Sequence, residues 1–403
     1  MMDASEISWA VTASALVLLM TPGVAFFYGG LVKVKSVLSM MMMSFGALGL
    51  ISVLWILYGF NMSRVSVPDQ FSGNPFSDFA LDSANNETLI SALFGATFAI
   101  ITVALVSGAI ADRAKFGAWL AFAGLWATFV YFPVAAWVWG GGWIMNLGYA
   151  LGLDYTVIDY AGGTAVHINA GAAALALAIV LGKRVGFGKG SHKPHNVPLV
   201  LLGAAILWFG WFGFNVGAEY LNGMANAGLI AINTLGATGA AIIGWLVVEK
   251  VKEGKPTAVG ASSGAVAGLV AITPSCANLT PGLGLLLGLI AGAVCALAVE
   301  LKFKLGFDDS LDVVGIHMIG GLLGTIYLGF FATGTGLFVG GNAMQLVLQL
   351  VASLAVLGYS FVVALALGWV ISRTIGFRVG SDDELAGIDT VVHGENGYVL
   401  DSV

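Results

Sequence analysis

The stretch DYAGGTAVHINAG, from Asp159 to Gly171, lies between two long apolar segments of the chain. It places a carboxylate and, eight residues later, an imidazole in otherwise apolar surroundings. Both groups are costly to transfer into hydrocarbon, so ionisable side chains in such a segment are functional candidates. A second stretch, DSLDVVGIH, from Asp309 to His317, repeats this spacing. Each histidine is followed four residues later by a glycine, Gly171 or Gly321.

The composition indicates a membrane protein. Of the 403 residues, 58% are hydrophobic and only 9% are charged, whereas a soluble domain carries about 25% charged residues. The two cysteines, Cys276 and Cys295, form neither a disulfide framework nor a metal-ligand spacing. We therefore expect a polytopic helical protein in contact with a lipid bilayer. We expect no catalytic residues, no enzyme activity, no metal, no cofactor and no nucleic-acid partner.

Eleven segments approach the roughly 20 apolar residues that a spanning helix needs. The expected spans are 8–32, 37–62, 89–111, 116–139, 162–181, 197–214, 228–248, 258–277, 283–301, 313–331 and 346–371. The eighth has the weakest hydrophobicity, because it begins with GASSGAVAG.

The basic residues lie in alternate connections between these spans, which supports the span count. Fifteen of the sixteen lysines and arginines fall on one predicted side, and only Arg64 falls on the other. Basic loops stay in the cytoplasm. The pattern therefore predicts a multi-pass protein of the cell membrane (plasma or inner membrane) with its N-terminus outside and its C-terminus in the cytoplasm.

The two histidine stretches predict the architecture. The first opens span five from outside and the second opens span ten from inside, which is the pattern of an inverted repeat of five plus five helices. We expect an all-α transmembrane domain over residues 1–373, with repeats at about 8–182 and 197–331 and an additional long C-terminal helix at about 346–371. Residues 374–403 are expected to form a cytoplasmic tail.

Helix geometry places the two histidines close together. Eight residues of helix rise about 12 Å, so each ring lies about 12 Å inside its face of a core about 30 Å thick. The remaining axial gap of about 6 Å allows two imidazoles to share a hydrogen bond and relay a proton. Structural alternatives are a satisfied core hydrogen bond for His167 and His317, and helix N-capping for Asp159 and Asp309. A bis-histidine haem site is a further alternative from a different functional class.

Several motifs resemble those of the ammonium transporter family (Amt/Mep/Rh). Besides the two histidine stretches, they are TPGVAFFYGGLVKVKSVLSM, AWVWGGGW, GKRVGFGK, WFGWFGFN, ASSGAVAGLVAITP and the tail motif HGENGY, in order along nearly the whole chain. The resemblance implies a homotrimer of eleven-helix protomers, each with its own pore for ammonium or ammonia. It also implies a possible PII-type signal protein as a partner at the cytoplasmic face.

The resemblance also implies roles for individual residues. Ammonium would be recruited at an outer site, deprotonated and conducted as ammonia, with or without the proton, through an apolar pore. The implied substrate-binding positions are Phe94, Phe98, Trp139 and Ala218; Phe98 and Phe214 form the gate, and Phe27 lies low in the pore. His167 and His317 match the twin pore histidines, and Asp159 and Asp309 support the site. Ordinary helix packing for the phenylalanines and interfacial anchoring for Trp139 are the structural alternatives.

One position departs from the family pattern. Ala218, in GFNVGAEY, stands where a serine hydroxyl usually completes the outer site. This change leaves a second function open, an ammonium sensor of the same fold with little transport. A chain that ends at Val403 is compatible with a whole transporter or with a truncated sensor module.

Overall fold

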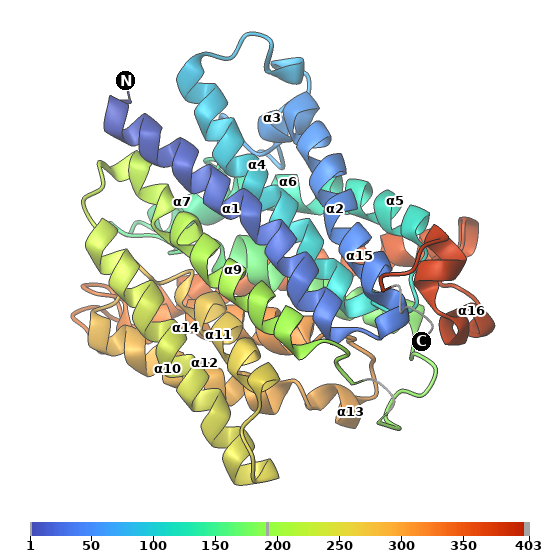
Figure 1. The fold of residues 1–403 in the computed structure, drawn as a ribbon. Coiled ribbons are helices and arrows are strands. Elements are labelled where there is room, and N and C mark those ends of the chain that lie inside the picture. Colours follow the sequence, from blue (N-terminus) through green and yellow to red (C-terminus); the bar gives the residue numbers. More distant parts are fainter. Residues whose placement is uncertain (1, 191–192, 399–403) are drawn as a thin grey trace.

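The chain folds into a bundle of long, tilted helices (Figure 1). The computed structural model describes residues 2–190 and 193–398. In these residues the regular structure is helical, apart from one isolated antiparallel bridge between Ala114 and Arg378. The expected all-α membrane fold is therefore confirmed.

The helices of the first half are α1 (Ala4–Leu31), η1 (Val34–Ser36), α2 (Val37–Leu54), η2 (Trp55–Gly59), α3 (Phe60–Met62), η3 (Phe79–Leu81), α4 (Asn86–Val106), η4 (Ser107–Ile110), α5 (Phe116–Trp126), η5 (Ala127–Tyr131), α6 (Phe132–Val138), α7 (Trp143–Ala150), η6 (Gly163–Ile168) and α8 (Asn169–Leu181). Several of these segments follow one another without a break, so that α2, η2 and α3 form one continuous helix.

The second half contains α9 (Val197–Asn215), η7 (Gly217–Asn222), α10 (Ala227–Glu253), α11 (Ala258–Ile272), α12 (Pro281–Ala298), α13 (Leu301–Leu305), η8 (Val314–Met318) and α14 (Ile319–Phe331). The long helix α15 (Met344–Thr374), the short helix α16 (Ser381–Ala386) and η9 (Asp389–His393) follow.

The number of spanning helices differs slightly from the prediction. Ten helical segments of the described chain are long and apolar enough to cross a membrane, and α11, with 15 residues, is shorter. It corresponds to the eighth expected span, which was the least hydrophobic. Of its 15 residues, 12 are buried, because glycine, alanine and serine side chains let it pack between α9, α10, α12 and α14.

The first helix begins earlier than expected because of a local cap. The Asp3 carboxylate accepts hydrogen bonds from the backbone N–H groups of Ser5 and Glu6, while the Glu6 carboxylate accepts one from Asp3. This reciprocal capping box satisfies N–H groups that a helix start leaves free. The helix therefore starts at Ala4 rather than near Ser8.

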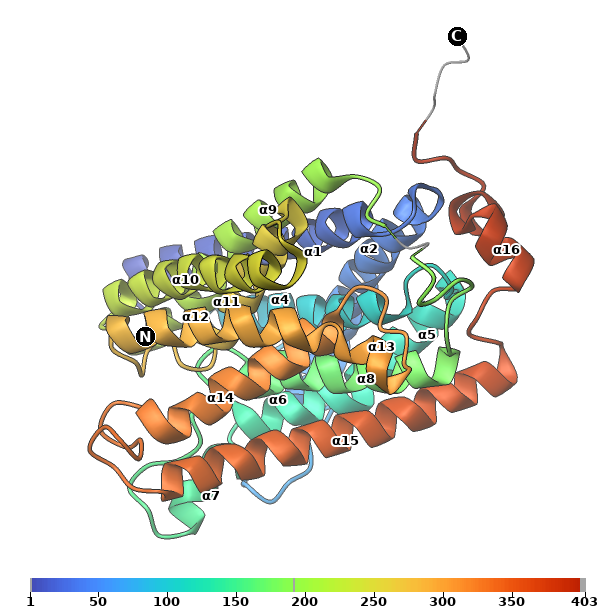
Figure 2. The same cartoon turned by 90° about the horizontal axis from the view of Figure 1, so that it is seen from below.

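The two halves of the chain meet along corresponding helices. Helix α1 packs along α9, and η6 and α8 pack against α14 and η8. Such contacts between equivalent segments are what an inverted repeat predicts. Helix α15 runs along one side of this arrangement (Figure 2), where it packs against α8 and α14.

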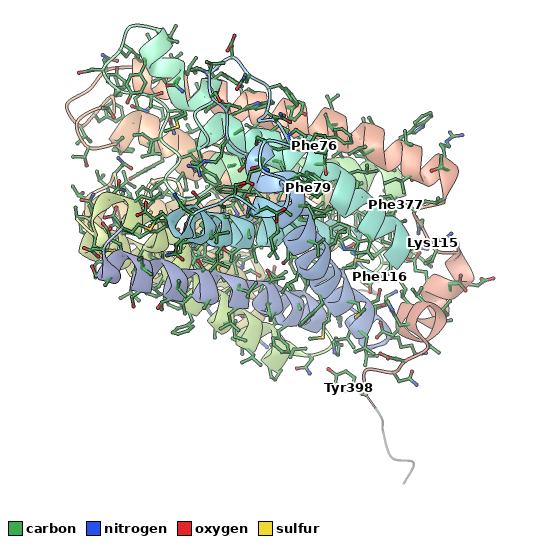
Figure 3. All side chains as sticks on the ribbon, turned by 90° about the horizontal axis from the view of Figure 1, so that it is seen from above. Phe76, Phe79, Lys115, Phe116, Phe377 and Tyr398 are labelled. Atoms are coloured by element: carbon green, nitrogen blue, oxygen red, sulfur yellow. The ribbon has the colours of Figure 1, made fainter. Side chains whose placement is uncertain are left out.

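The C-terminal segment packs onto one end of the bundle. Its short helix α16 projects beyond the long helices in Figure 2. In Figure 3, Phe377 lies near Lys115 and Phe116 at the start of α5. The backbone N–H of Lys115 donates to the carbonyl of Phe377, and that of Val379 donates to Arg113. The predicted tail is thus attached to the helical domain by backbone hydrogen bonds.

Candidate functional site

Two buried histidine rings face each other where the halves of the chain cross. Nδ1 of His167 lies 3.2 Å from Nδ1 of His317, and the ring planes are inclined by only 25°. Both residues lie in π-helical turns, His167 in η6 and His317 in η8. Such turns are rare and often occur at functional sites, because the wider turn redirects a side chain. The short distance expected from the spacing is therefore present.

The glycines that follow the histidines permit this approach. A Cβ atom on Gly171 would lie 2.6 Å from the backbone nitrogen of Met318. A Cβ atom on Gly321 would lie 2.9 Å from the carbonyl oxygen of Gly163 and 3.0 Å from Cβ of His167. The helices cross so closely that only glycine fits without displacing backbone.

The histidine pair lines a narrow apolar cavity of about 10 Å³, close to the minimum volume that one water molecule requires. The other lining side chains are Met20, Val24, Phe27, Tyr28, Ile101, Leu105, Val166, Leu207, Trp211, Phe214 and Val266. Nε2 of His167 has no hydrogen-bond partner among the described residues. The cavity therefore admits only small molecules and offers them few polar groups.

A stacked aromatic pair closes one end of this cavity. The rings of Phe98, on α4, and Phe214, on α9, have centroids 4.1 Å apart and an interplanar angle of 17°. Phe214 lines the narrow cavity, whereas Phe98 lines a wider space on the other side of the pair. Passage between the two spaces requires these rings to move.

The wider space is a vestibule of about 370 Å³. The vestibule brings together all four predicted substrate-binding residues, Phe94, Phe98, Trp139 and Ala218. Phe94 and Trp139 flank Phe98, with ring centroids 4.9 Å and 5.9 Å from it. Aromatic faces in this arrangement attract cations, at about 0.5–2 kcal/mol for each contact.

Asp159 lies behind this site. Its two carboxylate oxygens accept hydrogen bonds from the backbone N–H groups of residues 162, 163, 164 and 165. Its carbonyl accepts the indole N–H of Trp139 at 2.8 Å. Asp159 therefore connects the start of the histidine segment to a vestibule wall.

Asp309 takes a similar position before η8, where its carboxylate accepts the N–H of Val314 at 2.7 Å. The helices start at Gly163 and Val314, one residue after the starts of the predicted spans. Each carboxylate reaches forward from outside its helix to accept N–H groups at the helix start, which is the contact that the N-capping alternative describes. Phe27 also lines the cavity, next to Tyr28, with ring centroids 6.0 Å apart.

Three residues of the site were not predicted. The Trp211 ring stacks on His167, with centroids 5.6 Å apart. Trp211 precedes Phe214 by three residues, so both side chains lie on one face of α9. This spacing could have predicted Trp211 as a site residue. Tyr160 lines the vestibule and donates a hydrogen bond to Glu219. No sequence pattern connects Tyr160 with Glu219.

A buried ion cluster lies where the described C-terminal segment packs against the bundle. The Arg184 guanidinium donates to both carboxylate oxygens of Asp308 at 2.9 Å and to Asp112 at 3.0 Å. Burial alone raises the pKa of Asp308, but the hydrogen bonds and charge of Arg184 outweigh burial and hold this pKa below its usual value. The cluster joins the ends of three spanning segments.

Comparison with known proteins assigns this architecture to a family. Residues 8–398 match the family model described as Ammonium Transporter Family. The chain belongs to the ammonium transporter family. An ammonium transporter of Mycobacterium tuberculosis is 50% identical, with 98% of this chain and 90% of that protein covered. Ammonium transporter Amt1 of Archaeoglobus fulgidus is 40% identical, with 98% and 100% covered.

Solved structures of the ammonium transporter family have the same fold. Candida albicans Mep2 is similar with a TM-score of 0.86 and 31% identity, covering 100% of this chain and 94% of that one. A chain described as a sensor Amt protein has a TM-score of 0.87 and 28% identity, covering 96% and 97%. The relatives named here are described as ammonium transporters or as a sensor Amt protein, and none of these descriptions mentions haem.

Proposed function

We propose that this protein conducts ammonium nitrogen across the cell membrane through the vestibule, the stacked phenylalanines and the histidine-lined cavity. One observation carries the proposal. Phe98 and Phe214 stack between an aromatic vestibule and a narrow apolar cavity that contains the paired imidazoles of His167 and His317. The relatives that are 40–50% identical are named ammonium transporters, whereas the sensor protein is 28% identical. This difference favours transport over sensing.

Recruitment takes place in the vestibule. Ammonium that leaves water loses hydration, and the faces of Phe98 and Trp139 replace part of it by cation–π attraction. Aromatic groups hold the ion weakly enough to release it, which conduction requires. A carboxylate in direct contact would retain the ion, and none of the described residues that line the vestibule carries one.

Deprotonation provides the selectivity. The cavity beyond the rings is lined mainly by hydrocarbon, where a full charge is strongly disfavoured. Ammonium surrenders a proton and continues as neutral ammonia, whereas K⁺ and Na⁺ have no neutral form. Nε2 of His167, which has no partner among the described residues, accepts the released proton. His167 then gives its Nδ1 proton to Nδ1 of His317 along their hydrogen bond.

We propose further that the vestibule opens to the outside and that the cavity leads to the cytoplasm. The charge pattern supports this orientation, with fifteen of sixteen basic residues on the side of the C-terminus. Family membership supports a homotrimer and a PII-type protein at the cytoplasmic face. Mass measurement of the detergent-solubilised protein tests the trimer, and co-purification with a PII-type protein tests the partner.

Transport is tested by reconstitution into liposomes. An ammonium gradient is expected to drive saturable uptake, and K⁺ at the same concentration is expected to produce none. Liposomes with the Phe98→Trp variant, whose larger ring obstructs the stacked pair, serve as the matched control. Binding of ammonium without any uptake by the wild-type protein would support the sensor function instead.

A further inference from the structure

Glu219 is a fully buried carboxylate next to the position where the family hydroxyl is missing. It directly follows Ala218 and has no exposed surface. Its Oε1 accepts hydrogen bonds from Tyr160 at 2.5 Å and from the Asn222 amide at 3.3 Å, and its Oε2 accepts the N–H of Asn226 at 2.7 Å. None of the ion pairs found among the described residues involves Glu219.

Hydrogen-bond donors surround both oxygens of this carboxylate. The three groups around Glu219 all donate to it, so both of its oxygens act as acceptors. The carboxylate lies behind the vestibule wall and is connected to it by Tyr160.

Tyr160 links this carboxylate to the substrate space. It lines the vestibule together with Phe98, Trp139 and Ala218. Burial, and next the hydrogen bond with Glu219, raise the pKa of Tyr160, so the phenol keeps its proton. A hydroxyl has one proton and two acceptor lone pairs. Since the proton is directed to Glu219, the oxygen is left with acceptor capacity only.

We infer that the Tyr160 hydroxyl is a hydrogen-bond acceptor for ammonium in the vestibule and that Glu219 is the residue that positions it. The inference rests on the proposed function, because it assigns a further binding residue to the same outer site. Ammonium has four N–H donors, and aromatic faces offer no lone pairs of comparable strength. The Tyr160 oxygen, polarised by Glu219, supplies an acceptor that Ala218 lacks. The same chemistry suits methylammonium and other small cations with N–H groups.

Two measurements on the purified full-length protein test this assignment. The first is isothermal titration with ammonium chloride at constant ionic strength, and the second is the initial uptake rate in liposomes. Tyr160→Phe is expected to raise both Kd and KM about five- to tenfold, with little change in the maximal rate. Glu219→Gln is expected to change Kd and KM in the same direction.

A rescue variant distinguishes binding from a structural role. Ala218→Ser, introduced into Tyr160→Phe, is expected to recover most of the lost affinity because it returns a hydroxyl to the vestibule. Tyr155→Phe is the matched control, since that hydroxyl bonds to Asn342 and is not in the vestibule lining. Its Kd and KM are expected to equal those of the wild type.

An unchanged Kd in a Tyr160→Phe protein with normal thermal stability would overturn the inference. A fall in thermal stability and maximal rate without any change in Kd would also overturn it, since this result identifies a structural hydrogen bond. If the wild type binds ammonium but shows no uptake, the transport proposal fails. The Kd of Tyr160→Phe then still decides the role of Tyr160.

Discussion

His167 and His317 are 150 residues apart in the chain, yet their Nδ1 atoms lie 3.2 Å apart in a buried cavity. This contact exists because the helices that continue the two π-helical turns come close together at glycines, Gly171 of α8 against Met318 and Gly321 of α14 against Gly163. The pair lies directly beyond the stacked rings of Phe98 and Phe214. It is the point at which the two halves of the chain and the proposed substrate path coincide.

Removal of either ring is expected to abolish ammonium selectivity or alter it radically while the protein still assembles. His167→Ala or His317→Ala leaves the other imidazole without its hydrogen bond, at a cost of about 1–3 kcal/mol. Ammonium and K⁺ currents measured in liposomes check this expectation. His195→Ala, a histidine bonded to the Val32 carbonyl outside the cavity, is the control. Unchanged currents and unchanged exclusion of K⁺ in both variants would rule out a relay through the pair.

The helix crossing is expected to reject a single added methyl group. Gly171→Ala places Cβ within 2.6 Å of the Met318 backbone nitrogen, and such overpacking costs about 1–3 kcal/mol. Gly358→Ala is the matched control, because a Cβ there has nothing within 4 Å and alanine favours the helix by up to about 1 kcal/mol. Thermal unfolding in detergent should show a lower midpoint for Gly171→Ala and no loss for Gly358→Ala. Equal midpoints would show that the crossing is less tight than the structure indicates.

Acid is expected to weaken the cluster of Arg184, Asp308 and Asp112. The pKa of Asp308 is lowered from 3.8 in the folded protein. Between the folded-state pKa and 3.8, the unfolded chain therefore binds more protons at this residue than the folded chain does. The stabilisation is fully present above about pH 4 and is lost as the pH falls from 3.8 through the folded-state pKa. Unfolding midpoints measured from pH 6 to pH 3 should therefore fall for the wild type. Asp308→Asn should be less stable at pH 6 and lose less on acidification; parallel curves would contradict this assignment.

A hydroxyl at position 218 is expected to tighten ammonium binding several-fold. Ala218 lines the vestibule, and a hydrogen bond to a charged group contributes about 1.5–3 kcal/mol, most of which a water molecule in the same place can supply. The net gain of about 1 kcal/mol corresponds to a several-fold change in Kd. Calorimetric titration of Ala218→Ser measures it, and the thermal midpoint should stay constant. Unchanged or weaker binding would show that the vestibule is built without a role for this position.

The orientation can be checked on intact cells. Single cysteines introduced at Lys189 and at Asp78 lie in loops that the charge pattern places on opposite sides, Lys189 inside and Asp78 outside. An impermeant thiol reagent should label position 78 and spare position 189. Labelling of both after permeabilisation provides the control. The reverse pattern would invert the proposed topology.

The sequence by itself determined the membrane class, ten of the eleven expected spans and the closeness of the two histidines. These properties depend on local composition and on helical rise, which act over one segment at a time. The weak hydrophobicity of residues 258–277 likewise indicated the eighth span as the exception, and this segment contains the short, buried helix α11. The family resemblance pointed to Phe94, Phe98, Trp139, Ala218 and Phe214. In the structure the first four line one vestibule, and Phe214 stacks on Phe98.

Only the tertiary structure decided which distant groups share a proton or a charge. Tyr160 meets Glu219 across 59 residues, and Arg184 meets Asp308 across 124. Neither pair has a periodic pattern, because each depends on how two helix ends are placed by packing elsewhere. The π-helical turns at His167 and His317 are also absent from the sequence pattern, since a widened turn differs from an α-helical one by a single residue. Short-range periodicity therefore determined the segments, and non-local packing determined the chemistry of the site.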